Sequence, residues 1–249
     1  GRIQSAGQAT VAATVGGTDG GLAFGPTGVL FCTWFGPNRV SQILPGSAVT
    51  NRVDDLGPLG ISATVGACTF VPAGLPGAGR LKVASYAGPG FYDVPLTPDG
   101  TGTFSPGTAT LTAPLPTGTE GLVYAPASAP LFGGQLLVCE WTAGSIVTYQ
   151  VDANGDPLLA TRQVVVNGVA SPGGGAVDPT TGDLVFCVNG GQLVLLRADA
   201  NCGPVSAYGA ASPGGGVTAT LTASGCAHVG QTVFLHSQGP GNALGLVAA

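Results

Sequence analysis

The sequence predicts an all-β protein, and three observations lead to that prediction. Hydrophobic residues make up 44% of the 249 residues and occur in short, regularly alternating runs, which is typical of strands. The 44 Gly and 20 Pro residues lie between these runs, where they act as turn residues. A third observation, an internal repeat, then narrows the fold class.

One sequence phrase recurs four times, about 50 residues apart. It consists of a Gly followed by apolar residues, a turn containing Pro, and a second apolar run with a small residue near its end. The copies begin at Gly21, Gly66, Gly121 and Gly175. This period suits a four-stranded antiparallel unit. The sequence therefore predicts a β-propeller, most simply with four blades, over residues 1–200.

The strands of each blade are expected in order along the chain. In the first three units, the third and fourth strands are expected at 40–44 and 49–54, at 91–96 and 108–113, and at 146–151 and 162–166. The fourth unit supplies three strands, at 175–177, 184–188 and 192–196. Each run is short, contains β-branched residues and is bounded by turn residues.

A further strand at 9–15 precedes the first unit and has no partner within it. It is expected to pair with 192–196, which closes the ring and leaves no free sheet edge. The alternative is that the chain is a piece of a ring with more blades. Residues 201–249 are expected to form a small Gly-rich β tail, docked on the ring or truncated, with strands at 217–222, 232–236 and 244–248.

The run from Gly21 to Val40 resembles an NHL-type propeller repeat, whose pattern is Gly-apolar-Ala, a Pro-x-Gly turn, an apolar strand and Asn-Arg. This resemblance implies a propeller that belongs among enzymes of lactonase-like type, scaffolds or binding proteins. The tail is similar to a Gly-rich C-terminal β-module of large secreted bacterial proteins. We therefore expect a secreted, periplasmic or extracellular location.

Composition excludes some partners. The net charge is −5 and Lys82 is the single lysine, so the basic surface expected of a nucleic-acid-binding protein is missing. There is no uninterrupted apolar segment near 20 residues, so no membrane-spanning helix is predicted.

The ends of the second strands share one face of a propeller, and we expect a ligand there. Trp34, Tyr86 and Trp141 are expected at equivalent positions, with carboxylates nearby. Aromatic rings offer a large contact area, which suits a glycan or protein ligand. The alternative is that these rings cap the core between blades. The predicted ligand-binding residues are Trp34, Arg39, Tyr86, Glu120, Glu140, Trp141 and Asn189.

The cysteines do not predict a metal centre. Cys32, Cys139 and Cys187 recur near the ends of second strands, where a small apolar residue is needed for packing. Cys202 and Cys226 flank part of the tail and are candidates for a disulfide. The run from Asp152 to Asp156 contains Asn-Gly between two β runs and is expected to be a hairpin turn.

No catalytic residue and no cofactor are predicted, since His228 and His236 match no zinc motif. The leading hypothesis is a secreted, non-catalytic binding or structural propeller. One alternative is a metal-dependent, lactonase-like hydrolase or lyase, with Glu120, Glu140 and Asn189 as ligands. Another is a subunit of an extracellular fibre or surface assembly that self-associates through the tail.

Overall fold

A computed structural model describes residues 2–5, 8–10, 13–17, 19–129, 131–189, 192–196, 220–224 and 234–238. For 2–5, 8–10, 220–224 and 234–238 it describes the backbone alone. The described residues form strands and three short 3-10 turns, Pro26–Gly28, Gly57–Leu59 and Leu159–Thr161, with no α-helix among them. In this part of the chain, no helix is long and apolar enough to cross a membrane.

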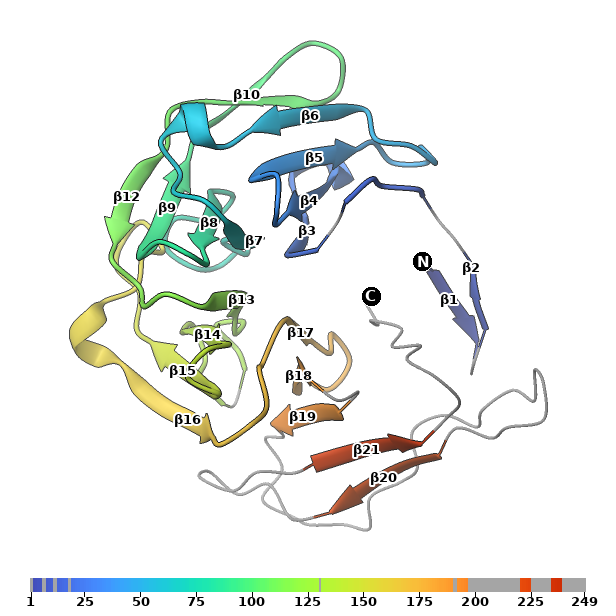
Figure 1. Cartoon of the computed structure of the whole chain (residues 1–249), viewed down its shortest axis with the longest axis vertical. Helices are drawn as coiled ribbons and strands as arrows, with labels where there is room; N and C mark the ends of the chain where they lie inside the picture. Colours follow the sequence, from blue (N-terminus) through green and yellow to red (C-terminus); the bar gives the residue numbers. More distant parts are fainter. Residues whose placement is uncertain are drawn as a thin grey trace.

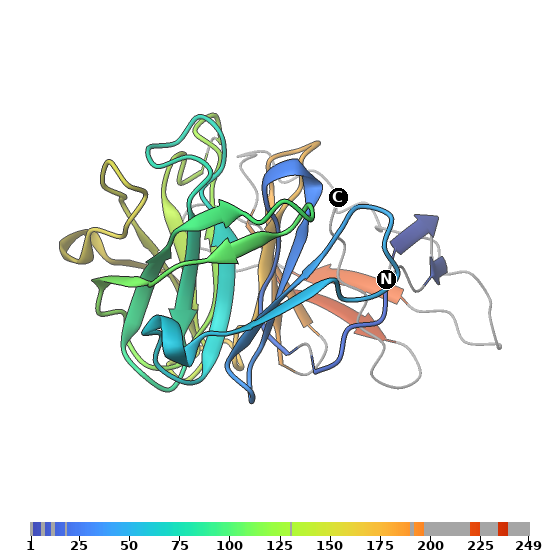
Figure 2. The ribbon, with the colours of Figure 1, turned by 90° about the horizontal axis from the view of Figure 1, so that it is seen from above.

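Four antiparallel sheets surround a common centre as the blades of a propeller (Figure 1). The inner strands are β3 (Leu22–Phe24), β7 (Val65–Phe70), β13 (Thr119–Tyr124) and β17 (Gly175–Val177). Contacts join β3 to β7, β7 to β13, and β13 to β17, so the blades follow one another in chain order. The edge-on view shows the sheets of the blades packed side by side (Figure 2). The predicted all-β, four-blade arrangement is confirmed.

The remaining blade strands follow outward from the centre. The first blade adds β4 (Leu30–Trp34), β5 (Arg39–Ile43) and β6 (Arg52–Asp55). The second adds β8 (Leu81–Ser85), β9 (Gly90–Val94) and β12 (Thr110–Ala113), and the third adds β14 (Leu136–Glu140), β15 (Ser145–Tyr149) and β16 (Gln163–Asn167). The fourth adds β18 (Leu184–Val188), β19 (Gln192–Leu196), β21 (Phe234–Gln238) and β20 (Thr220–Ser224), in that spatial order.

The recurring glycines allow the inner strands to approach one another closely. A β-carbon at Gly66 would collide with the carbonyl oxygen of Thr119 on the next inner strand. At Gly121 it would collide with the carbonyl oxygen of Gly173, which precedes the fourth inner strand. Because both neighbours are backbone atoms, a side chain cannot be accommodated by a change of rotamer. The glycine of the repeated phrase is therefore a packing requirement.

The hydrophobic core is divided into three clusters, each between two neighbouring blades. Phe31 and Val83 belong to the cluster between the first and second blades. Leu122 and Phe91 belong to the next cluster, and Phe186 belongs to the cluster between the third and fourth blades. The second and third strands of a blade are buried on both faces, because one face packs against each neighbouring blade. Successive residues of these strands are therefore both apolar, and the strands read as continuous apolar runs.

A hairpin of β10 (Leu96–Pro98) and β11 (Phe104–Pro106) interrupts the second blade between β9 and β12, and the sequence did not predict it. It reaches the first blade, where the buried Gln42 side chain bonds both backbone groups of Phe104. Nε2 donates to the carbonyl oxygen at 2.6 Å, and the amide N–H donates to Oε1 at 2.9 Å. The side chain of Gln42 thus ties the second blade to the first.

The expected closure of the last blade by residues 9–15 is corrected by the structure. The outer neighbour of β19 is β21, with Val194 paired to Phe234. Near the N-terminus, β1 (Arg2–Ser5) instead pairs with β2 (Gln8–Thr10), and Thr14 bridges to Val49. A strand edge offers backbone groups to any extended segment, so the pattern of side chains does not specify which one pairs there.

Two of the strands expected in the tail overlap with β20 and β21. The third, at 244–248, lies outside the described residues, as do Cys202 and Cys226.

Candidate binding site

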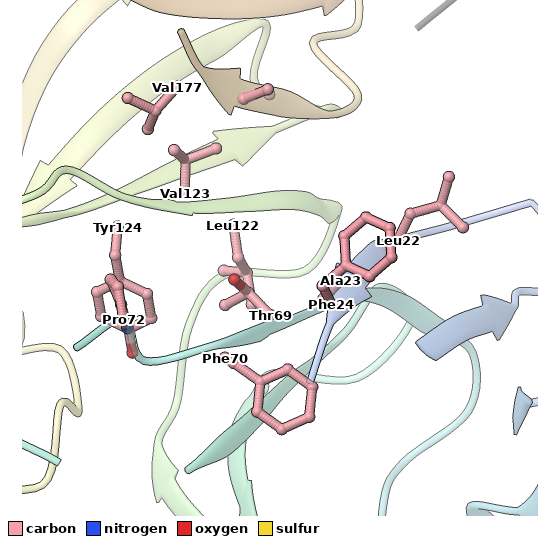
Figure 3. Close-up of a pocket in the computed structure, with 12 residues that line it drawn as sticks. Leu22, Ala23, Phe24, Thr69, Phe70, Pro72, Leu122, Val123, Tyr124 and Val177 are labelled. Atoms are coloured by element: carbon pink, nitrogen blue, oxygen red, sulfur yellow. The ribbon is translucent and has the colours of Figure 1, made fainter. Parts of the chain in front are cut away.

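A cavity of about 220 Å³ lies at the centre of the four inner strands (Figure 3). β3 and β17 line it along their whole length, and β7 and β13 contribute residues from their C-terminal halves or just beyond. The lining residues are Leu22, Ala23, Phe24, Thr69, Phe70, Pro72, Leu122, Val123, Tyr124, Gly175, Ala176 and Val177. The cavity is therefore assembled from all four copies of the repeated phrase, near the end that leads into the turns.

The lining of this cavity contains no charged side chain. Its polar side chains are Thr69 and Tyr124, and the Tyr124 hydroxyl donates a hydrogen bond to the carbonyl oxygen of Gly155 at 2.5 Å. Burial, with nearby carboxylates such as Asp156, raises the pKa of Tyr124, so this side chain stays neutral. The arrangement offers apolar contact and dispersion rather than acid–base chemistry.

Two large apolar side chains remain exposed beside the cavity. Leu22 is 46% exposed and Phe24 is 58% exposed, whereas Ala23 between them packs against the core shared with the second blade. Leu22 and Phe24 point to the opposite side, because side chains alternate along a strand. They leave an apolar approach to the cavity from the first blade.

Strand pairing fixes which residues of different blades are equivalent. Gly121 pairs with Cys139 in the third blade, and in the first blade the Thr33 N–H donates to the carbonyl oxygen of Gly21 at 3.0 Å. Thr33 is therefore the counterpart of Cys139. The sequence alignment, which placed Cys32 there, is wrong by one residue, because the lengths of the apolar runs alone do not fix where pairing begins.

Because of the same one-residue shift, Phe35 rather than Trp34 is equivalent to Tyr86 and Trp141. Phe35 and Tyr86 pack edge to face, with ring centroids 5.0 Å apart. The Trp141 ring lies near the backbone of Gly173. All of these rings are partly buried, and each closes the space between two neighbouring blades. Of the two interpretations given above, these contacts favour capping of the core between blades.

Trp34 faces the other side of the first blade. Its Nε1 donates to Ser41 Oγ at 3.0 Å, and the backbone at Gly16 and Gly17 lies against the indole. Its paired neighbour Arg39 forms an exposed ion pair with Asp55, at 2.6 Å between Nε and Oδ1. Exposed pairs of this kind contribute little to stability.

Glu140 is 2% exposed and fully engaged in contacts within its own blade. The Arg162 guanidinium contacts it at 3.1 and 2.7 Å, and Ser145 Oγ donates to it at 2.8 Å. This ion pair holds β14 to the segment before β16. Asn189, also part of the predicted set, is exposed, and its N–H donates to the carbonyl oxygen of Ala170 at 2.7 Å.

Glu120 has the most unusual electrostatic environment of the predicted set. Its Oε2 atom is buried and has no hydrogen-bond partner. Burial, together with the charge of Asp19, raises the pKa of Glu120 to about 7. Within the described residues, no three His, Cys, Asp or Glu side chains converge to hold a metal ion. Of the ligands predicted for a metal-dependent enzyme, Glu140 is already paired with Arg162 and Ser145.

The structure does not gather the seven predicted residues into one site. Their positions lie at or just beyond the ends of second strands or at the starts of the adjoining first and third strands, whereas the cavity is lined by β3 and β17 and by the later residues of β7 and β13. Sequence reasoning missed the cavity residues, because the apolar positions of the repeat serve equally well as core. Nothing in the sequence distinguishes Phe24 from a core residue. Its unusual exposure is visible only in the structure.

Comparisons with known proteins support the fold alone. No protein-family model matches the chain, and no curated protein matches it. Among solved structures, a nidogen/laminin complex aligns with a TM-score of 0.50 and 13% identity, covering 80% of this chain and 70% of that one. Virginiamycin B lyase from Staphylococcus aureus aligns at 0.45 and 13%, covering 82% and 63%. Glutaminyl cyclase from Myxococcus xanthus aligns at 0.49 and 12%, covering 96% and 95%.

These solved structures are β-propeller proteins, and they include both enzymes and non-enzymatic proteins. The chain is likewise a β-propeller protein, as its four blades and inner-strand packing show.

Proposed function

We propose that this propeller is a non-catalytic binding protein that receives a small apolar group in its central cavity. One observation carries the proposal: the cavity at the centre of the ring is lined by apolar and uncharged side chains. The predicted carboxylates lie elsewhere, and Glu140 is already paired with Arg162. The cavity supports binding better than it supports catalysis.

The volume indicates the size of the group. A dry cavity of about 150 Å³ lined by aliphatic and aromatic side chains binds benzene. The cavity here, at about 220 Å³, therefore has room for one aromatic ring or one branched aliphatic group. Such a group could belong to a small molecule or to a side chain of a protein ligand. The lining offers a glycan no charged side chain.

Isothermal titration with indole and, separately, with cellobiose tests the proposal. We expect saturable binding of indole and none of cellobiose. Ala176→Phe fills the cavity and should abolish indole binding, whereas Ala160→Phe places the same ring on an exposed turn and should leave binding unchanged. Binding of cellobiose without indole, or unaltered indole binding to a folded Ala176→Phe variant, would contradict the proposal.

A further inference from the structure

The only lysine of the chain is completely buried between two blades. Lys82 lies on β8 with a side chain that is 0% exposed. Its Nζ is 2.6 Å from Oδ1 of Asp156, which belongs to the loop between β15 and β16 of the third blade. It is also 3.0 Å from Oδ1 of Asp93, its paired neighbour on β9. An amine is thus enclosed between two carboxyl groups.

This arrangement is conspicuous in a protein with few charges. Only 8% of residues are charged, yet Lys82, Asp93, Asp156 and Arg80 meet at one boundary between blades. As an ion pair alone, such a cluster is a weak source of stability, because desolvation offsets most of the Coulombic attraction. The geometry is, however, that of a nucleophile, an electrophile and a proton acceptor held in contact.

We propose that Lys82 and Asp156 become joined by an intramolecular isopeptide bond. Lys82 first transfers one proton to the carboxylate of Asp156, which leaves a neutral amine beside a protonated carboxyl group. Lys82 Nζ then attacks the carboxyl carbon, an N–C bond forms, and the C–OH bond breaks. The carboxylate of Asp93 accepts a second proton from the nitrogen and passes it to the departing hydroxyl group, which leaves as water. The products are an amide between the two side chains and one water molecule, with no oxidant or other reactant required.

Neighbouring groups suit each part of this reaction. The Arg80 guanidinium bonds both oxygens of Asp93 and thereby keeps that side chain in the carboxylate form that can accept a proton. The Thr112 hydroxyl donates to Oδ1 of Asp156 at 2.9 Å, where negative charge develops during the attack. Asp152 Oδ1 accepts from the Asp156 N–H at 2.9 Å and holds the loop in place.

Proximity and exclusion of water favour the amide over its hydrolysis. Lys82 and Asp156 are 74 positions apart in sequence, but folding brings them into hydrogen-bond contact. The loss of entropy on bringing the two groups together therefore occurs during folding and does not add to the barrier of the reaction. The Asp156 side chain is only 9% exposed, and the Lys82 amine reaches no solvent. The bond would link the second and third blades covalently.

Intact-mass spectrometry of the denatured full chain tests the proposal directly. We expect a mass lower than that of the sequence by one water molecule. A mass equal to that of the sequence would overturn the proposal and leave the ion pair as the complete description.

The single lysine permits a second measurement on the same material. A lysine-specific endoprotease should leave the denatured chain uncut, because Lys82 is acylated, whereas a free Lys82 would give two fragments. Asp93→Asn removes the proton acceptor and should restore both the full mass and the cleavage. Asp54→Asn, which alters an ion pair with Arg52 elsewhere, should leave the chain cross-linked and uncut. Cleavage of the wild-type chain would refute the bond, whatever the variants show.

Discussion

Glu120 shows how the fold controls a single ionisable residue. Its carboxyl group is buried without a hydrogen-bond partner for Oε2 and lies within the field of Asp19. The sequence identified Glu120 as a ligand-binding candidate, because it interrupts the apolar pattern at the start of an inner strand. It could not indicate the protonation state, since that depends on burial and on Asp19, which is about 100 residues away.

The raised pKa of Glu120 determines how the stability of the folded protein changes with pH. Since its pKa rises from 4.5 to about 7 on folding, the folded state is favoured below pH 4.5 and loses that advantage as pH rises through 7. Glu120→Gln should therefore stabilise the protein by about 2 kcal/mol at pH 8, allowing for partial solvent screening. Urea unfolding at pH 8 and pH 4.5 measures this, and an equal difference at both values would contradict the assignment.

At the scale of the strands, the repeated glycine explains much of what the sequence could predict. The phrase predicted where the inner strands lie, because its first three copies each need a residue without a side chain at a close approach to the next blade. The hairpin of β10 and β11 could not be predicted, since it interrupts one copy only. The one-residue error at Trp34 arose because both Trp34 and Phe35 fit the end of an apolar run.

Gly66 provides the test of this packing requirement. Gly66→Ala should destabilise the protein by about 3 kcal/mol or more, because the new methyl group meets the carbonyl of Thr119 and the strands must separate. Gly57→Ala, where a β-carbon meets nothing within 4 Å, should have little effect. Thermal and urea denaturation compare the two, and similar stabilities for both variants would show that the approach of β7 and β13 is looser than described.

In the whole molecule, the sequence repeat determines the blades, whereas the cavity depends on how the four blades pack together. Four similar units predict four sheets around a centre, whichever side chains point inward. The hollow depends on the combined volume of side chains from all four inner strands, such as Phe70, Leu122 and Ala176. This combined volume cannot be derived from any single copy of the repeat. For that reason the sequence analysis predicted a ligand-binding face near the ends of the second strands instead.

The proposed function depends on a cavity, lined mainly by apolar side chains, where the four inner strands meet. A crystal structure under xenon pressure measures this most directly, because xenon occupies dry apolar cavities and avoids polar ones. We expect a xenon atom among Phe24, Phe70 and Leu122. Ordered water at that place, or side chains collapsed into it, would show that no apolar cavity is present.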